Sequence, residues 1–304
     1  MEGNNLERPS GGSPLRFILT LFIIIVVPLA LSLFLGSRLL PQPKIGIIRL
    51  SYDIAAETAD EVNRQLNYAR SDDSIQAVVL VINSPGGSAA YSEELYLSVL
   101  ETREEKPVVA TVDLLAASGA YFMAAAADEI YAKPTSYVGS IGVIAQLPGQ
   151  VYIDDFIITT GPYKAFGGTR DGMTRQIEMA KFAFLQAVEA GRGDRLQTDL
   201  AFLSRAEIYT AVQAQEMGLI DGLLSTDEAV KRAAELAGVS NYEVVELLPL
   251  AFPELLAGQS AGGGAASSRQ TALYRPPAVD PQTLWAAPTN LPTGLYYRYI
   301  EPGR

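Results

Sequence analysis

A Pro-Gly-Gly turn at the end of a wholly apolar run is the first feature that could do chemistry. The segment at residues 78–87 reads VVLVINSPGG, and an apolar run that stops at such a turn is typical of a buried parallel strand whose end lines a site. Two adjacent glycines, Gly86 and Gly87, let the backbone approach a ligand and turn N–H groups toward it. Such a turn could hold a developing oxyanion, and an ordinary turn is the alternative that Pro-Gly-Gly alone leaves open.

Ser118 is the second candidate, because it lies between a predicted strand and a predicted helix. The segment around it, LLAASGAYFMAAAADEIYA, follows a strand that we expect to end near Val112. A serine there could expose its hydroxyl at a helix N-terminus, whose partial positive charge favours an alkoxide, or it could simply cap the helix. Gly119 supplies the next backbone N–H, which together with that of Gly87 would form a two-donor oxyanion hole.

Histidine and cysteine are both absent from the 304 residues, which excludes whole mechanisms. A Ser-His-Asp triad, a Cys-His dyad, a zinc held by histidine or cysteine and a haem held by histidine are impossible within one chain. Nucleophilic catalysis would need Ser, Thr, Lys, Asp, Glu or Tyr, with lysine or a carboxylate as base. Lys164, in the Gly-rich and uncharged stretch GPYKAFGG, could be such a base, or a loop lysine that faces solvent. We expect no metal and no cofactor.

Charge and hydropathy point to a membrane rather than to nucleic acid. The net charge of −11, without a Lys/Arg cluster, argues against nucleic acid as a partner. Residues 17–35 are uncharged and flanked by Arg16 and Arg38, and at ~1.5 Å per residue they could span a ~30 Å hydrocarbon core. We therefore expect a transmembrane helix at 17–36 after a short N-terminal segment, 1–16. A cleavable signal peptide is the alternative, although its apolar region is usually ~7–15 residues, and the flanking charges do not decide the orientation.

Strand and helix patterns alternate after this segment. We expect strands at 44–50, 75–82 and 108–112, alternating with helices that end near 69, at 91–102 and at 116–127. This order implies right-handed βαβ units and a mainly parallel sheet, with ligands bound at the carboxyl ends of the strands, where both candidate loops lie. Further helices are expected at 173–191, 211–217 and 226–237, with a closing strand at 242–247. We therefore assign one α/β domain to residues 44–250.

The C-terminal residues 258–304 differ in composition from this domain. They begin GQSAGGGAASS and then become rich in proline, which predicts a disordered tail. The aromatic end LYYRYI, 295–300, could be a docking segment or simply part of a tail that carries aromatic residues.

Several ordered motifs give the chain a specific resemblance. They are NSPGG at 83–87, AASGAY at 116–121, AAAADEIYA at 124–132 and VGSIGVI at 138–144, with a weaker IYTAVQAQEMGLIDGLL at 208–224. In order and spacing they resemble the signal peptide peptidase A family, membrane-anchored serine proteases within the broader crotonase and Clp-protease superfamily. The resemblance covers roughly residues 44–247. It implies an α/β fold with a crotonase/Clp-protease-like repeated ββα (βαβ) core and a mainly parallel sheet, preceded by one transmembrane helix.

The resemblance also implies a Ser-Lys dyad, which suits a chain without histidine. Ser118 is then the nucleophile, Lys164 the general base and Ser140 a serine that orients the lysine amine, although Ser140 could instead be a turn serine between glycines. Gly86 and Gly87 match the oxyanion loop of the family. The implied reaction is peptide hydrolysis through an acyl-enzyme, on remnant signal peptides or other membrane-derived peptides. The family further implies a ring-like homo-oligomer in the cell membrane, single-pass, with its catalytic domain outside the cytoplasm.

Two segments depart from the family pattern. Residues 167–170 read Gly-Gly-Thr-Arg where the family commonly has Ser-Pro shortly after the lysine, and residues 204–207 read Ser-Arg-Ala-Glu where Gly-Arg is usual. Asp128 and Glu129 match the family, and we expect them to serve folding rather than proton transfer. The departures leave open an inactive membrane scaffold of the same fold. A crotonase-like acyl-CoA enzyme is a further alternative, which would need a carboxylate near the second glycine loop and leaves the serine and the lysine unexplained.

Overall fold

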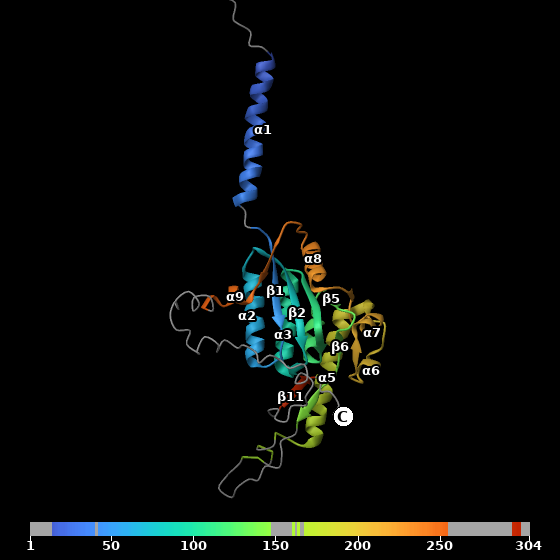
Figure 1. The fold of residues 1–304 in the computed structure, drawn as a ribbon. Coiled ribbons are helices and arrows are strands. Elements are labelled where there is room, and N and C mark those ends of the chain that lie inside the picture. Colours follow the sequence, from blue (N-terminus) through green and yellow to red (C-terminus); the bar gives the residue numbers. More distant parts are fainter. Residues whose placement is uncertain are drawn as a thin grey trace, which may run out of the picture. The chain divides into compact units, whose positions relative to one another are not determined.

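The computed structural model describes residues 14–39, 42–146, 160–161, 163–164, 167–254 and 294–298. The chain divides into two compact units, residues 1–42 and 43–304. The described part of the first unit consists chiefly of helix α1 (Pro14–Leu39), and the second unit holds the α/β domain (Figure 1).

Helix α1 is 26 residues long. Its side chains are described as far as Ser32, and large apolar ones among them are exposed, such as Phe17 at 71% and Leu31 at 55%. Within the part of the chain that is described, no helix is long and apolar enough to cross a membrane. The transmembrane helix expected at 17–36 is therefore not confirmed.

A mainly parallel sheet forms the centre of the second unit. Its strands lie in the order β10-β1-β2-β4-β5-β9, all parallel, while β6 pairs with β4 in parallel and with β8 in antiparallel orientation. The bounds are β1 (Lys44–Leu50), β2 (Ile75–Ser84), β4 (Val108–Ala117), β5 (Glu129–Ala132), β6 (Tyr137–Gly139), β8 (Ile208–Thr210), β9 (Gly222–Leu223) and β10 (Glu243–Glu246). The predicted α/β class with a mainly parallel sheet is confirmed.

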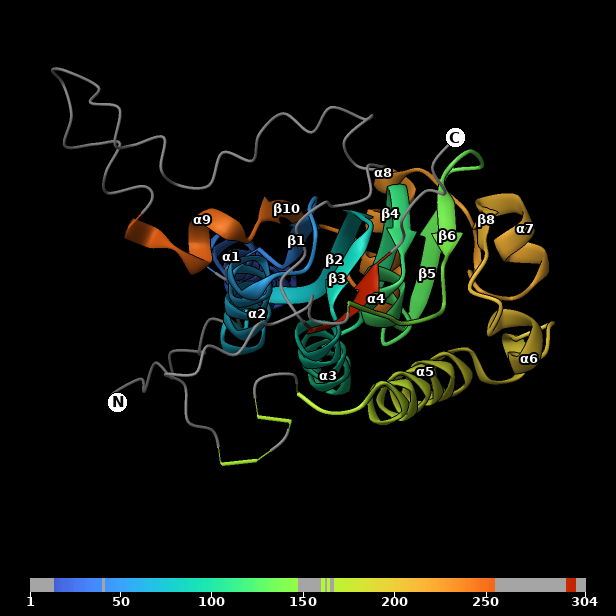
Figure 2. The ribbon, with the colours of Figure 1, turned by 90° about the horizontal axis from the view of Figure 1, so that it is seen from below.

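Helices cover both faces of this sheet (Figure 2). On one face α8 (Thr226–Leu236) packs its buried Ala229 and Ala233 against the strands, while α2 (Ala56–Ser71), α3 (Ala89–Glu105) and α4 (Gly119–Ala124) share the core on the other face. The remaining helices described are α5 (Arg170–Arg192), α6 (Leu200–Leu203), α7 (Ala211–Glu216), α9 (Leu248–Ala251) and the short 3-10 helix η1 (Gly193–Arg195). Because both faces are covered, residues 77–82 of β2 are all apolar, as the sequence predicted.

The end of β4 differs from the prediction. The small-residue segment was expected to be helical from residue 116, but Ala116 and Ala117 pair with Val138 and Gly139 of β6. This tertiary pairing overrides the high helix propensity of alanine. The helix consequently begins only after Ser118, which leaves that serine at the junction of strand and helix.

A second, three-stranded sheet adjoins the end of β2. Its order is β3-β11-β7, with β3 at Gly86–Ser88, β7 at Ile144–Gln146 and β11 at Gly294–Arg298. Strand β11 lies within the tail for which composition predicted disorder, and residues 255–293 and 299–304 lie outside the described residues. The structure thus differs from the sequence prediction at residues 294–298.

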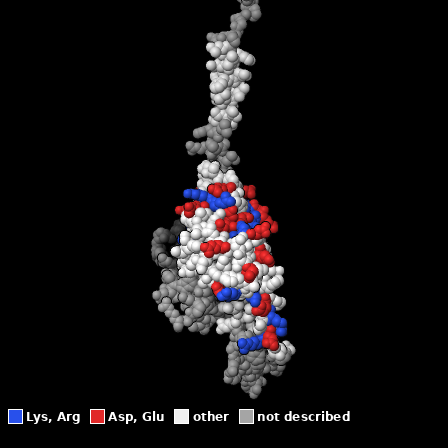
Figure 3. All heavy atoms as spheres, turned by 90° about the vertical axis from the view of Figure 1, so that its right-hand side faces the viewer, with Lys and Arg blue, Asp and Glu red and all other residues white. Residues whose placement is uncertain are grey.

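Acidic and basic side chains are intermingled on the face of the second unit shown in Figure 3. Some of the pairs that the structure describes are largely exposed, such as Arg49 with Glu246 at 2.8 Å. Pairs of this kind contribute about 0–1 kcal/mol each, so they do not account for the stability of the domain.

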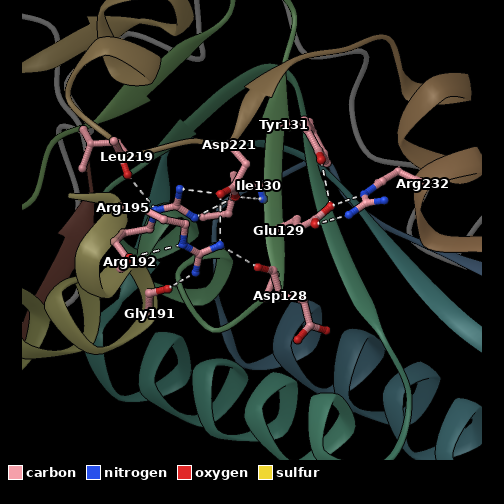
Figure 4. Close-up of polar contacts among 12 residues, drawn as sticks. Asp128, Glu129, Ile130, Tyr131, Gly191, Arg192, Arg195, Leu219, Asp221 and Arg232 are labelled. Atoms are coloured by element: carbon pink, nitrogen blue, oxygen red, sulfur yellow. Dashed lines mark hydrogen bonds and ion pairs between the residues drawn. The ribbon is translucent and has the colours of Figure 1, made fainter. Parts of the chain in front are cut away.

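In contrast to these exposed pairs, a buried ion-pair network joins the end of α5 to β5 (Figure 4). The guanidinium of Arg192, only 1% exposed, donates to both carboxylate oxygens of Asp221 at 2.8 and 2.9 Å and to the Gly218 carbonyl at 2.8 Å. Asp221 also accepts from the Ile130 N–H at 2.7 Å. The network therefore fastens the C-terminal end of α5 to β5 and to the loop before β9.

Asp128 and Glu129 accept hydrogen bonds in the same region of the fold. Asp128 accepts from the Val108 N–H at 2.8 Å, and Glu129 accepts from Arg232 at 2.7 and 2.8 Å. Both carboxylates thus tie β5 to its neighbours, which supports the expectation that they serve folding.

Arg192→Met is expected to lower the free energy of unfolding by about 3 kcal/mol, because it removes the fully buried partner of Asp221 and leaves that carboxylate, 14% exposed, with Arg195 as its charged partner at 3.0 Å. Arg205→Met is the matched control, since Arg205 pairs with Glu207 while 60% exposed, and should cost at most about 1 kcal/mol. Urea unfolding followed by circular dichroism measures both variants. Equal losses would contradict a structural role for the network.

The same pair sets an acid limit on stability. Burial raises the pKa of Asp221, but hydrogen bonds from Arg192 and its charge outweigh burial and hold the pKa below its usual range. A carboxyl group with a lowered folded-state pKa stabilises the protein above the unfolded pKa of about 3.9. That stabilisation is lost as the pH falls through the folded-state pKa.

Candidate active site

Ser118 lies on a sharp turn between β4 and α4. Its backbone has φ 55° and ψ −125°, a conformation that costs energy for any residue other than glycine. The Ser118 N–H donates to the Gly139 carbonyl at 2.8 Å, and the Phe122 N–H donates to the Ser118 carbonyl at 2.9 Å, so both main-chain groups are fixed. A strained strand-to-helix turn presents the nucleophile in the α/β-hydrolases.

The Ser118 side chain does not cap the helix. It makes no capping hydrogen bond to α4, and among the described residues its Oγ, although fully buried, has no hydrogen-bond partner. A buried hydroxyl without a partner costs about 1–3 kcal/mol, so such groups call for a reason. The geometry favours a reactive hydroxyl over the N-cap alternative.

Aromatic packing against α3 and α5 fixes the helix that follows the Ser118 turn. Phe122 of α4 stacks on Tyr96 of α3 at 4.9 Å between ring centroids and meets Phe184 of α5 at the same distance. Tyr121 is buried, and its hydroxyl donates to the Leu219 carbonyl at 2.7 Å. Helix α4 is thus clamped between two longer helices and the loop before β9.

The glycine loop follows the end of β2, the neighbour of β4. Ser84 lies opposite Ala116 in the pairing of these two strands, which places the loop next to the Ser118 turn. A Cβ atom on Gly87 would lie 2.1 Å from the Ile54 carbonyl oxygen, so only glycine fits there. Gly86 has φ 89°, again a conformation that glycine adopts without strain.

The two glycines differ in what their N–H groups can do. The Gly86 N–H already donates to Ser84 Oγ at 3.1 Å. The Gly86 carbonyl accepts from the Ile54 N–H at 2.9 Å, and in a trans peptide the next N–H points the opposite way, so the Gly87 N–H points away from Ile54. Of the two, Gly87 is therefore the candidate oxyanion donor. Gly119 opens α4, where first-turn N–H groups have no intrahelical partner.

Ser140 lies beside Ser118. The pairing of Ala117 with Gly139 puts the two serines directly after adjacent strands, β4 and β6. Ser140 is 7% exposed, has φ 53°, and its N–H donates to the Glu207 carbonyl at 2.7 Å. Three neighbouring strand ends thus bring together the glycine loop and both serines.

Lys164 is not brought to this cluster in the structure. Lys164 lies on an exposed turn, where its backbone N–H donates to the Gly161 carbonyl at 3.2 Å. The lysine side chain is not a hydrogen-bond partner of Ser118 Oγ. The neighbouring Tyr163 is 52% exposed as well. Ser118, Ser140 and the glycine loop therefore lie together, whereas Lys164 is not paired with Ser118.

The segments that depart from the family pattern have local structural roles. Gly167 and Gly168 have φ 76° and 136°, and the Thr169 hydroxyl accepts from the Gly172 N–H at 3.0 Å to cap α5. Ala206 has φ 58° and follows a turn after α6. These residues shape the two loops, whereas Ser118, Ser140 and the glycine loop belong to other segments of the chain.

The fold and the arrangement of strand ends define a protein of the Clp-protease-like class, and comparisons agree. A Clp protease family model matches residues 37–138, and a model of peptidase family S49 matches residues 101–240. A candidate protease of Synechocystis is 30% identical over 236 residues, covering 73% of this chain and 84% of that protein. The chain belongs to peptidase family S49, the signal peptide peptidase A family, as the motifs indicated.

Two other relatives match more than half of this chain. A candidate protease of Methanocaldococcus jannaschii is 36% identical over 195 residues, which covers 60% of this chain and 62% of that protein. The chloroplastic serine protease SPPA of Arabidopsis thaliana is 28% identical over 232 residues, covering 69% of this chain and 34% of its own length. The chain thus spans between about a third and two thirds of these two relatives.

Proposed function

We propose that this chain is a membrane-anchored serine endopeptidase that uses a Ser118–Lys164 dyad. The observation that carries the proposal is the buried, unpartnered Oγ of Ser118 on a strained turn beside a glycine loop. Membership of family S49 and a relative named as a serine protease support the serine chemistry. An inactive scaffold offers no reason to keep a strained turn and an unsatisfied hydroxyl.

The mechanism assigns one step to each group. Neutral Lys164 removes the Ser118 proton, and Ser118 Oγ attacks the peptide carbonyl carbon while N–H groups of Gly87 and Gly119 stabilise the oxyanion. Collapse of this intermediate breaks the C–N bond, and the lysine proton passes to the leaving amine. Lys164 then takes a proton from a water molecule whose oxygen attacks the acyl carbon. The bond between this carbon and Ser118 Oγ breaks, the peptide acid is released, and the lysine returns its proton to Oγ.

The lysine must move for this dyad to form. In the structure Lys164 lies on an exposed turn, so the proposal requires the segment around it to bring the amine to Ser118. In this proposal Ser140, which directly follows a strand adjacent to that of Ser118, accepts a hydrogen bond from the amine and orients it. We propose remnant signal peptides or other membrane-derived peptides as substrates, and a homo-oligomer as the assembled form.

The pH dependence of hydrolysis tests the base. Without histidine or cysteine, the side chains that ordinarily titrate near neutral pH are missing, so a lysine base predicts a rate that rises with pH. We expect kcat/KM for a fluorogenic apolar peptide, cleaved by the full-length protein in detergent, to increase from pH 6 to about 9.5. A flat profile would count against a lysine base.

Residues 17–36 are proposed to attach the protein to the cell membrane in a single pass, with the peptidase domain outside the cytoplasm. The uncharged run and the exposed apolar side chains of α1 support this. Full-length protein should remain in the membrane fraction during alkaline carbonate washing and be released by detergent, whereas a variant without residues 1–38 should be soluble. Release of the full-length protein by carbonate would contradict the anchor.

A further inference from the structure

A pocket of about 180 Å³ lies at the carboxyl end of β1, and the residues that line it differ from those of the candidate active site. The end of β1 with the loop after it, the first two turns of α2 and the start of α9 form its walls (Figure 2). Residues that line it include Arg49, Leu50, Tyr52, Glu61, Val62 and Leu248. Open α/β sheets bind ligands outside the carboxyl ends of their strands, so the fold favours a second site at this position.

Glu61 brings a negative charge to this pocket without a partner of opposite charge. The residue is half-buried, and among the described residues no lysine or arginine forms an ion pair with its carboxylate. Arg64, on the same helix, pairs instead with Asp60 at 3.9 Å and with Glu254 at 3.8 Å. Burial raises the pKa of Glu61, as expected for a carboxyl group that loses water and gains no cation. A ligand that supplies a positive charge would therefore stabilise the ionised carboxylate.

Arg49, the second charged residue in the lining, is already neutralised. Its guanidinium donates to the carboxylate of Glu246 on β10, from Nη2 at 2.8 Å and from Nε at 3.1 Å. This pair contributes no net charge, so the ionised Glu61 leaves the lining negative. The charge balance thus favours a cationic ligand over an anionic one.

The remaining lining suits an apolar body attached to that cation. Leu50, Val62 and Leu248 contribute aliphatic side chains, and Tyr52 contributes an aromatic ring. Aromatic rings attract ammonium groups, and a carboxylate accepts strong charge-assisted hydrogen bonds from them. A cavity of about 150 Å³ holds a benzene molecule, so this pocket has room for an apolar group of that size.

We propose that this pocket binds a small organic ammonium ion, a primary amine that carries an apolar group about the size of a benzene ring. The ammonium group pairs with Glu61, while the apolar group packs against Leu50, Val62 and Leu248. This site goes beyond the proposed function, because it shares no residue with the Ser118 site and requires no hydrolysis.

Fluorine NMR of a small probe, 4-fluorobenzylammonium, tests the site in the full-length protein in detergent, with detergent alone as the blank. We expect a Kd of about 1 mM, which is ordinary for so small a ligand. The probe 4-fluorobenzyl alcohol has nearly the same shape without the charge and should bind at least ~5-fold more weakly, because it forms no ion pair with Glu61. Equal affinity for the two probes, or no binding of the ammonium, would overturn the proposal.

Glu61→Gln tests the carboxylate itself. It should weaken binding of the ammonium at least ~5-fold and leave binding of the alcohol unchanged, a difference that a merely structural effect would not produce. Glu57→Gln is the matched control, since Glu57 is exposed on the same helix and is not among the lining residues. An unchanged affinity of the ammonium for Glu61→Gln would contradict the assignment of this carboxylate.

Leu248→Trp tests the position of the site by filling part of the pocket. It should weaken both probes at least ~5-fold, because the larger side chain takes the space of the apolar group. Leu97→Trp, at a position 62% exposed on α3, is the control and should bind both probes as the wild type does. Undiminished binding to a folded Leu248→Trp protein would place the probes elsewhere and overturn the proposal.

Ser118→Ala separates this proposal from the proposed function. The variant should bind 4-fluorobenzylammonium as the wild type does, since Ser118 is not among the lining residues. Binding that persists in a protein without peptidase activity would contradict the peptidase and retain the pocket. An active peptidase that does not bind the ammonium would contradict the pocket and retain the peptidase.

Discussion

Ser118→Ala is expected to reduce kcat for peptide hydrolysis by roughly 10⁴-fold or more, because the attacking oxygen is removed and the rest of the machinery cannot replace it. The stability should not fall, since Ser118 Oγ has no hydrogen-bond partner among the described residues and alanine keeps the Cβ atom. Hydrolysis of a fluorogenic apolar peptide by the full-length protein measures the loss, with thermal unfolding as a check on folding.

Ser71→Ala is a matched control for this substitution. Ser71 is exposed at the end of α2, where its hydroxyl donates to the Tyr68 carbonyl at 3.0 Å, far from any group assigned to the reaction. Its removal should leave kcat unchanged. A folded Ser118→Ala protein that still turns over substrate at the wild-type rate would rule out Ser118 as the nucleophile.

Lys164→Ala should also abolish activity, by roughly 10³-fold or more, since a positioned general base typically contributes 10²–10⁴-fold and this one acts in both half-reactions. Its effect on the free energy of unfolding should be small, because the structure places the side chain on an exposed turn. The combination of a large kinetic loss with unchanged stability is the signature of a base that contacts the serine only in the working enzyme.

Lys231→Ala provides the control, since Lys231 is an exposed lysine on α8, on the opposite face of the sheet from α4. It should retain wild-type kcat and KM. If Lys164→Ala hydrolysed peptides normally, another base would have to serve Ser118, and the dyad would be wrong.

The scaffold of the site was predictable because its signals are local and strong. The apolar run ending in Pro-Gly-Gly, and the second strand before Ser118, have partners on both sides and helices on both faces, so almost every residue of the runs is apolar. Parallel strands in turn place their carboxyl ends at one edge, which is why two loops distant in sequence were expected to meet.

The reasons that particular groups matter were not visible in the sequence. Gly87 is required because the Ile54 carbonyl oxygen occupies the space that a Cβ atom would need. The sequence around Ile54 gives no sign of that contact. Ser84 was part of the recognised motif, yet its role as acceptor for the Gly86 N–H, which singles out Gly87 as donor, needed coordinates. The strained backbone of Ser118 likewise depends on the pairing of β4 with β6.

Strand β11 shows the limit of composition as a guide. A Pro- and Gly-rich tail predicts disorder because it cannot bury enough apolar surface by itself. Residues 294–298 nevertheless form a strand, since β3 and β7 offer open edges that pair with main chain regardless of side chains. Only the alternative interpretation of LYYRYI as a docking segment accommodates this pairing.

Covalent labelling of the nucleophile tests the central claim most directly. Full-length protein in detergent would be treated with a serine-directed fluorophosphonate, digested, and analysed by mass spectrometry to locate the adduct. We predict a single adduct on Ser118, formed much more slowly in Lys164→Ala and blocked by prior addition of a peptide substrate. An adduct on a different serine, or an unlabelled Ser118 in protein that hydrolyses peptides, would contradict the assignment of Ser118 as the nucleophile.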